Sequence, residues 1–299
     1  MQTDLQHEEP DVSPVVVRAL LHQEVPELAR LPLHRLTNTG SDNVSYRLGT
    51  QLVVRLPRSS DATVRLGDEL SWLPRLAGLP VAVPEVVHLG TPQEVFPHPW
   101  AVLRWLDGVD AWAARHHEHW FGPELGRDLA DVVRHLRRMG VDGAPPREPG
   151  QRGGPLRALD ARVRWWLDGA DGLVDVRAVL RTWQECLEGA ADDVQPALVH
   201  GDLIPGNLLV AEARLTAVID WGGLGAGDPA QDLDPAWSVL DAAGATTFRQ
   251  ALDVDEASWL RGRGFALEHA LGGVVHYVPR RHPLGDVMLR SLDRLLSGR

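Results

Sequence analysis

Short apolar runs separated by turn residues fill the first third of the chain. Runs rich in β-branched residues and bounded by Gly, Pro, Asn or Asp predict strands, and such runs occupy residues 33–36, 44–48, 52–56, 80–89 and 100–106. Apolar residues spaced three and four positions apart predict helices over residues 14–31 and 66–76. This part of the chain is therefore predicted to form a small antiparallel sheet with helices beside it.

The rest of the chain follows a mostly helical pattern. Apolar spacing predicts helices at residues 125–139, 248–252, 259–271 and 287–296, with two more between 156 and 190. Residues 140–155 are rich in Gly and Pro, which predicts a long loop of the kind that often borders a substrate site. Three short apolar runs, at 197–199, 208–210 and 215–219, predict buried strands within this helical region. The whole pattern is that of an α+β protein.

Polar residues suited to chemistry follow these last strands. Asp202 comes after the first run in a His-Gly-Asp sequence, Asn207 stands five positions later, and Asp220 directly follows the third run at the start of Asp-Trp-Gly. Asp, Asn, Pro and Gly are common in turns for purely conformational reasons, so each residue alone is best interpreted as a turn former. Their occurrence together, each after a strand-like run, favours a catalytic site.

The motif His-Gly-Asp-x-x-x-x-Asn, followed by Asp-Trp-Gly, resembles the protein-kinase pair H-R-D-L-x-x-x-N and D-F-G. Gly201 in place of the kinase Arg, the Pro-Gly before Asn207 and the later Gly-Ala-Gly-Asp-Pro-Ala-Gln-Asp are similar to the aminoglycoside phosphotransferase family of small-molecule kinases. The resemblance implies a two-lobed protein-kinase-like fold, with a small antiparallel N-lobe sheet in residues 1–104 and a larger, mainly helical C-lobe in residues 105–299. It also implies that Asp202 is the catalytic base, and that Asn207 and Asp220 bind Mg²⁺ on the nucleotide phosphates.

The same resemblance implies that the N-lobe binds the nucleotide. Arg55 stands where protein kinases carry the Lys that grips the first phosphates, and Glu69 on the following helix is its expected partner. Arg can neutralise phosphate but is not equivalent to Lys. The alternative is that Arg55 and Glu69 form an ion pair that only braces the helix against the sheet.

Two further segments of the N-lobe are assigned by the resemblance. Gly40 and Ser41 lie in a polar loop that occupies the place of the glycine-rich loop over the phosphates, although an ordinary hairpin loop fits this loop equally well. Leu103 and Trp105 lie where a kinase-like chain crosses between the lobes, so backbone groups near them are expected to meet the purine. The side chain of Trp105 is also consistent with a core position.

The charge of the chain is unevenly distributed. The formal net charge is −11, and residues 192–260 hold twelve acidic residues against two Arg. An acidic surface attracts cations and repels nucleic acid, so we expect no nucleic-acid partner. Two interpretations of the acidic segment remain open: it faces a positively charged acceptor, with Asp232 and Asp234 as candidates, or it provides surface carboxylates for solubility.

Other sequence features limit the class of protein. No apolar run approaches the ~20 residues of a membrane span, and the acidic N-terminus is unlike a signal peptide, so we expect a cytoplasmic protein without a membrane partner. Cys186 is the single cysteine, which precludes an internal disulfide and suits a buried spectator thiol. His116, His117 and His119 show no recognisable ligand spacing, so a solvated helix face is favoured over a metal site.

We therefore expect an enzyme that uses Mg²⁺ and transfers a phosphoryl group from ATP or GTP to a hydroxyl group of a small molecule. The family resemblance implies an antibiotic acceptor and a role in resistance. The acceptor would be an aminoglycoside or another hydroxylated natural product, such as a macrolide or a nucleoside antibiotic. Open alternatives are a nucleotide-binding pseudokinase, a kinase of a metabolite sugar or amino alcohol, and a metal-dependent hydrolase. A monomer and a homodimer are both consistent with the sequence.

Overall fold

The computed structural model describes residues 10–36, 42–190 and 193–297. The chain divides into two compact units. The first unit comprises Met1–Gly78 and Ala82–Asp107, and the second unit comprises Leu79–Val81 and Gly108–Arg299. The first unit contains a small antiparallel sheet and the second is larger and mainly helical, which is the α+β arrangement that the hydrophobic pattern predicts.

The first unit is built on one five-stranded antiparallel sheet in the order β1-β2-β3-β5-β4. Its strands are β1 (Leu33–Arg35), β2 (Asn43–Leu48), β3 (Leu52–Pro57), β4 (Val86–Gly90) and β5 (Trp100–Arg104). Strands β2 and β3 form a tight hairpin whose turn uses Gly49 at φ +60°, a conformation that costs glycine little. Tyr46, Val54 and Trp100 point into the core and are fully buried.

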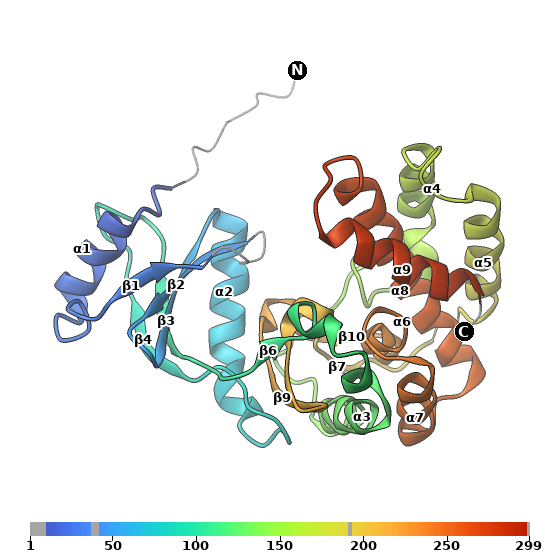
Figure 1. The fold of residues 1–299 in the computed structure, drawn as a ribbon, viewed down its shortest axis with the longest axis horizontal. Coiled ribbons are helices and arrows are strands. Elements are labelled where there is room, and N and C mark those ends of the chain that lie inside the picture. Colours follow the sequence, from blue (N-terminus) through green and yellow to red (C-terminus); the bar gives the residue numbers. More distant parts are fainter. Residues whose placement is uncertain (1–9, 37–41, 191–192, 298–299) are drawn as a thin grey trace. The chain divides into compact units, whose positions relative to one another are not determined.

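Helix α1 (Pro14–Glu24) packs an apolar face on this sheet (Figure 1). Val17 and Leu20 are fully buried and belong to the same hydrophobic cluster as the inward side chains of the sheet. The prediction that this helix continues to residue 31 is wrong. Pro26 disfavours the helical conformation of the residue before it, and Val25 accordingly leaves the helix with φ −139°.

Helix α2 (Ser60–Trp72) begins before residue 66, where apolar spacing placed its start. Ser59 caps the helix, because its hydroxyl oxygen accepts a hydrogen bond from the N–H of Ala62 at 3.2 Å. The strand predicted over residues 80–89 is reduced to β4. Pro80 and Pro84 lack the N–H group that a strand needs for its ladder, so the regular strand begins only after them.

Helices make up most of the second unit, where α3 (Pro123–Arg138), α4 (Asp160–Asp168), α5 (Val176–Glu188), α6 (Pro235–Ser238), α7 (Ala242–Leu252), α8 (Glu256–Tyr277) and α9 (Leu284–Ser297) are found. Helix α8 is buried along much of its length and packs beside α9 and α5 (Figure 1). It extends beyond the predicted 259–271, and Asp255 caps its start by accepting the N–H of Ser258 at 2.7 Å. Within the described residues, none of the helices is both long enough and apolar enough to cross a bilayer.

Two small sheets in the second unit position the polar motif. Strands β6 (Val109–Asp110), β8 (Leu208–Ala211) and β9 (Arg214–Val218) form one sheet, and β7 (Ala197–Val199) pairs with β10 (Gly225–Gly227) in the other. The three short strands predicted from the sequence are therefore present. Leu208 at the start of β8 lies opposite Val218 at the end of β9, so the residues just before β8 and just after β9 meet at one end of the sheet.

Candidate active site

Asp202 and Asn207 are in direct contact. Asp202 lies in the loop after β7, and Asn207 ends a short 3-10 turn (Pro205–Asn207) that leads into β8. The side-chain amide nitrogen of Asn207 donates to the carboxylate Oδ2 of Asp202 and to its backbone oxygen, both at 2.9 Å. With its nitrogen engaged in this way, the Asn207 side chain presents its oxygen as the group able to accept a metal ion.

Asp220 is held at the same end of the sheet. The N–H of Ile219, the residue before it, donates to the backbone oxygen of Asn207 at 3.0 Å. Asp220 itself adopts a left-handed conformation, with φ 63° and ψ 63°, which turns the chain sharply after β9. Such a conformation is uncommon for residues other than glycine and is often found at functional sites. The structure thus brings Asp202 and Asn207 together and ties the turn that carries Asp220 to them.

A buried carboxylate holds the backbone of residues 200–207, the candidate catalytic loop. Asp232 is only 2% exposed, and its two oxygens accept the N–H groups of His200 at 2.8 Å and Gly201 at 2.9 Å. Burial raises the pKa of Asp232, while His200, the two backbone N–H groups and Arg137 act in the opposite direction. Of the two interpretations left open for the acidic segment, the one in which Asp232 faces a cationic acceptor does not hold for this residue, because both of its oxygens bind the loop inside the protein.

His200 links the loop to the turn before Asp220. Its Nδ1 accepts the N–H of Asp202 at 3.2 Å, and its Nε2 lies 3.2 Å from the backbone oxygen of Ile219. Both contacts are satisfied when the ring carries its proton on Nε2. The ring is fully buried and packs on Trp221 at 4.5 Å between centroids. His200 thus has a positioning role that the sequence motif did not assign.

Gly201 lets the candidate catalytic loop approach the Asp-Trp-Gly turn closely. Gly201 has φ +82°, and a Cβ atom there would lie 2.4 Å from the backbone oxygen of Gly223. At the same position it would lie 3.2 Å from the guanidinium of Arg147. Burial lowers the pKa of Arg147, and the nearby Asp232 opposes this. Glycine at 201 therefore makes room for both a neighbouring backbone and an Arg from another loop.

The Gly- and Pro-rich loop contributes two Arg residues that the sequence reasoning missed. The guanidinium of Arg147 lies close to Gly201, and Arg152 places its Nη1 3.7 Å from Oδ1 of Asp202. The composition of residues 140–155 predicted a loop near a substrate site, but no motif identified the residues within it. Only contacts between segments far apart in the sequence reveal them.

The Gly-Asp-Pro segment after β10 is braced by Arg261. Asp228 accepts the N–H of Ala230 at 2.9 Å with one oxygen, and with the other it binds Nε of Arg261 at 2.7 Å. Both side chains of this ion pair are less than a tenth exposed. Arg261 also donates to the backbone oxygen of Gly189 and to the hydroxyl of Ser258. The basic residue at 261, to which the sequence gave no role, supports the segment that carries Asp232.

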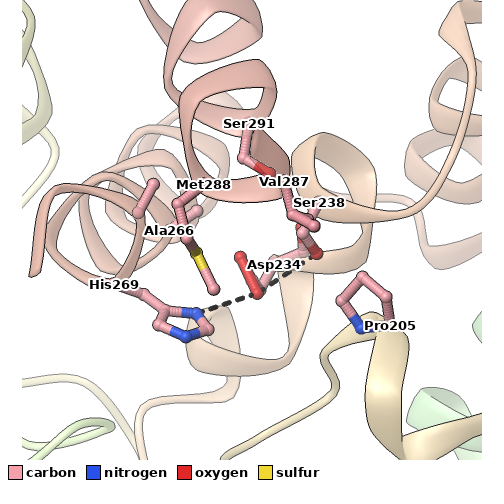
Figure 2. A pocket seen from close by; sticks show the side chains of 9 residues that line it. Pro205, Asp234, Ser238, Ala266, His269, Val287, Met288 and Ser291 are labelled. Atoms are coloured by element: carbon pink, nitrogen blue, oxygen red, sulfur yellow. Dashed lines mark hydrogen bonds and ion pairs between the residues drawn. The ribbon is translucent and has the colours of Figure 1, made fainter. Parts of the chain in front are cut away.

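A small cavity adjoins the catalytic loop at Pro205. Figure 2 shows Asp234 between His269 and Ser238 in the wall of this cavity. Oδ2 of Asp234 lies 3.4 Å from Nδ1 of His269 and accepts the hydroxyl of Ser238 at 3.3 Å. The cavity volume is about 10 Å³, which suffices for roughly one water molecule. Asp234 therefore faces a space that is too small for an antibiotic ring.

Many of the acidic residues that give the segment 192–260 its charge have structural partners. Asp241 caps α7 by accepting the N–H of Gly244 at 2.7 Å, Asp255 caps α8, and Glu256 pairs with Arg249. Carboxylates at helix N-termini satisfy free N–H groups and interact favourably with the helix dipole. These uses weaken the interpretation that the segment is an acidic surface for a cationic acceptor.

The first unit contains the predicted pair between strand and helix. Arg55 on β3 places Nη1 2.7 Å from Oε1 of Glu69 on α2, with side chains 12% and 1% exposed. Leu103 is 2% exposed and lies within β5. The N–H of Trp105 donates to the backbone oxygen of Gln51 at 2.7 Å, and the Arg47 guanidinium stacks on the ring of Trp105. The predicted loop residues Gly40 and Ser41 lie outside the described residues.

Candidate ligands other than the motif residues do not form a metal site. The described part of the chain holds no group of three or more His, Cys, Asp or Glu residues placed to bind a metal ion. His117 instead stacks on Trp120 at 4.3 Å between ring centroids, and His119 lies edge-on to the same ring. Cys186 is fully buried, and burial raises the pKa of its thiol to about 12, which agrees with a spectator thiol.

Comparison with known proteins places this geometry in context. The sequence matches the model of the phosphotransferase enzyme family over residues 35–266. No curated protein sequence matches the chain significantly.

Solved structures similar to this one include the GDP complex of aminoglycoside 2'-phosphotransferase-IIIa, with a TM-score of 0.72, 16% identity and coverage of 95% of this chain and 98% of that chain. The streptomycin–ATP complex of APH(2")-IIa has a TM-score of 0.59 at 16% identity, with coverage of 96% and 99%. Macrolide 2'-phosphotransferase MphH from Brachybacterium faecium has a TM-score of 0.61 at 24% identity, with coverage of 94% and 98%. These matches confirm the kinase-like fold predicted from the sequence.

Proposed function

The chain belongs to the phosphotransferase enzyme family, and from this membership we propose that it transfers the γ-phosphoryl group of ATP or GTP to a hydroxyl group of a small molecule. The observation that carries the proposal is the contact between Asn207 and Asp202. It holds a carboxylate beside an amide whose oxygen is the group able to accept a metal ion. This is the division of labour between base and metal ligand that phosphoryl transfer requires.

Asp202 acts as the base or orienting group for the acceptor. Asn207 occupies Oδ2 of Asp202, so Oδ1 is the oxygen that receives the hydroxyl proton. The side chain is 31% exposed, which suits a group that must reach a solute. As the hydroxyl oxygen forms its bond to the γ-phosphorus, the bond from that phosphorus to the β–γ bridging oxygen breaks, and the proton passes to Asp202.

Asn207 and Asp220 are the residues that would hold Mg²⁺. An amide oxygen and a carboxylate are ligands that suit a hard cation, and Mg²⁺ commonly takes only one or two protein carboxylates together with phosphate oxygens and waters. The lack of a larger ligand cluster among the described residues fits an ion that completes its coordination with the nucleotide. When bound, the ion would neutralise phosphate charge during transfer.

Arg55 and Glu69 are the proposed phosphate clamp of the first unit. A guanidinium fixed by a buried carboxylate is pre-organised to meet phosphate oxygens. Backbone groups near Leu103 and Trp105 are proposed to contact the purine. Because the N–H of Trp105 is engaged by Gln51, a purine contact at this residue would use its carbonyl oxygen.

We infer an antibiotic as the acceptor. Structures of similar fold are those of aminoglycoside and macrolide phosphotransferases, in complexes that include GDP, and ATP with streptomycin. Since many carboxylates of the acidic segment have internal partners, the charge of the chain does not favour an aminoglycoside over a macrolide as the acceptor. A nucleotide-binding pseudokinase and a kinase of a metabolite sugar or amino alcohol are the competing functions.

Mass spectrometry of reaction mixtures tests the proposal. Purified protein is incubated with Mg-ATP or Mg-GTP and a panel of aminoglycosides, macrolides, nucleoside antibiotics, sugars and amino alcohols. We expect one class of acceptor to gain one phosphate, with an equal amount of nucleoside diphosphate formed. A nucleotide-induced rise in melting temperature without any phosphorylated product would indicate a pseudokinase. Release of inorganic phosphate or cleavage of an acceptor without nucleotide would indicate a hydrolase.

A further inference from the structure

Arg152 is a positively charged residue that contacts the proposed catalytic base from a distant loop. Its Nη1 lies 3.7 Å from Oδ1 of Asp202, the oxygen that Asn207 leaves open. On the other side, Nε of Arg152 lies 3.3 Å from Oε2 of Glu268 on α8. Arg152 therefore bridges the proposed base and a second carboxylate.

Glu268 is built to hold Arg152 in place. Its side chain is only 3% exposed, and its other oxygen, Oε1, pairs with Nε of Arg162 at 2.8 Å. An ionised carboxylate buried to this degree needs compensating charge, and Arg162 provides one positive charge. The positive charge of Arg152 is then balanced by Asp202. The network links four charged side chains in the order Asp202, Arg152, Glu268 and Arg162.

The loop around Arg152 is fixed at both ends to the segment that follows the Asp-Trp-Gly turn. The N–H of Arg147 donates to the backbone oxygen of Ala226 at 2.9 Å, and the N–H of Asp228 donates to that of Gly153 at 2.7 Å. Arg162 adds a hydrogen bond to the backbone oxygen of Gly150 at 2.7 Å. Arg152 thus extends from an anchored loop, which is a requirement for a group that must keep another side chain in position.

The catalytic segment itself lacks a positive charge near the base. Between residues 198 and 232 the only Lys or Arg is Arg214. It is two-thirds exposed and makes a bidentate pair with Asp128. A loose phosphoryl-transfer transition state gains from cations near the transferred group, so a cation supplied from elsewhere in the chain would be of use.

We propose that Arg152, held by Glu268, is a positioning residue for Asp202 in the phosphotransfer reaction. It keeps the Asp202 carboxylate turned so that Oδ1 meets the acceptor hydroxyl. At 3.7 Å the contact is an ion pair but longer than a hydrogen bond, so Oδ1 retains the capacity to accept the hydroxyl proton. This inference rests on the proposed function, because the role of Arg152 is exerted through the base.

Steady-state kinetics of Arg152 variants test the inference on an acceptor found by the panel above. In Arg152→Gln we expect kcat to fall about tenfold to a hundredfold, as part of the roughly 10²- to 10⁴-fold contribution of a positioned base, while KM for the nucleotide stays within about twofold. Arg152→Lys is expected to recover part of kcat because it restores the charge. Glu268→Gln is expected to lower kcat less than Arg152→Gln.

Arg157→Gln is the matched control. Arg157 is exposed and donates to the backbone oxygen of Ala190, so its replacement should leave kcat unchanged.

A double-mutant cycle separates a positioning role from a structural one. If Arg152 acts through the base, Arg152→Gln should cost less than about twofold in kcat when introduced into Asp202→Asn. Full additivity of the two losses, or a wild-type kcat in Arg152→Gln, would overturn the inference while leaving the phosphotransferase function intact. A wild-type protein that phosphorylates no acceptor would overturn the proposed function, and with it the role of Arg152.

Discussion

The catalytic loop, residues 200–207, and the following segment, residues 228–234, both carry aspartates but use them in opposite ways. Asp202 in the loop is 31% exposed, and its Oδ1 lies 3.7 Å from Nη1 of Arg152, beyond hydrogen-bond distance. Asp232 in the segment is 2% exposed and has both oxygens bound to backbone N–H groups. We infer that Asp202 has an oxygen accessible to a solute, whereas Asp232, with both oxygens engaged, supports the backbone.

Removing the carboxylate of Asp202 should give the largest effect. In Asp202→Ala we expect turnover to fall by a factor of about 10³ or more, because the acceptor hydroxyl loses its base. Nucleotide binding and melting temperature should stay close to those of the wild type, since the side chain is partly exposed and supports little of the core. The check combines kcat with calorimetric nucleotide binding, and an unchanged kcat would remove Asp202 from the mechanism.

Changing Asp232 should affect stability as well as turnover. In the wild type, the two carboxylate oxygens of Asp232 accept the N–H groups of His200 and Gly201. Asp232→Asn keeps the size of the side chain but turns an amide NH₂ towards one of these two N–H groups. Leaving one buried donor unsatisfied should destabilise the second unit by about 1–3 kcal/mol and lower kcat through a displaced loop. Denaturant unfolding followed by tryptophan fluorescence measures the first effect. A lower kcat with unchanged stability would show that Asp232 acts in the reaction, as proposed for Asp202, rather than by holding the loop backbone.

Glu24 extends the comparison to an engaged carboxylate of the first unit. Burial alone would raise its pKa, but hydrogen bonds from Thr91, His88 and Gln93 outweigh burial and lower the pKa to about 2, from 4.5. A depressed pKa in the folded state means that the carboxylate stabilises the protein above about pH 4.5, and that this stability is lost as the pH falls towards 2. In Glu24→Gln we expect a loss of about 1–2 kcal/mol at pH 7, after allowance for solvent screening.

The measurement for Glu24 is the free energy of unfolding as a function of pH. Between pH 4.5 and 2 the wild type should lose stability faster than Glu24→Gln, so the difference between the two proteins should shrink. Parallel curves for both proteins would show that the carboxylate of Glu24 contributes no pH-dependent stability.

Local patterns in the sequence located most of the strands, but not the short β6 and β10. Asp202 and Asn207 are five residues apart, and the short turn between them brings their side chains into contact, although Asp232 and His200 also hold this loop. Arg55 and Glu69 are fourteen residues apart on a strand and the following helix, and their pairing was expected from the kinase resemblance. Helix ends were less predictable: Pro26 ended α1 early, whereas Ser59 extended α2 towards its N-terminus.

Contacts between distant segments could not be predicted from spacing. Arg152 contacts Asp202 across fifty positions and contacts Glu268 across 116 positions. Apolar periodicity locates faces of helices and strands, but it carries no information on which loop meets which strand end. The same limit applied to Asp232: the sequence left open whether its carboxylate faces a substrate, and the structure shows that it binds the loop backbone.

The deep burial of Cys186 has a practical consequence. Cys186 is the single cysteine, is fully buried, and has a thiol pKa raised to about 12. Its sulfur can therefore react with a thiol reagent only when helix α5 separates from its neighbours. The rate of labelling then reports how often the larger unit opens. The labelling rate of Cys186 in the wild-type chain therefore measures conformational opening without an engineered probe.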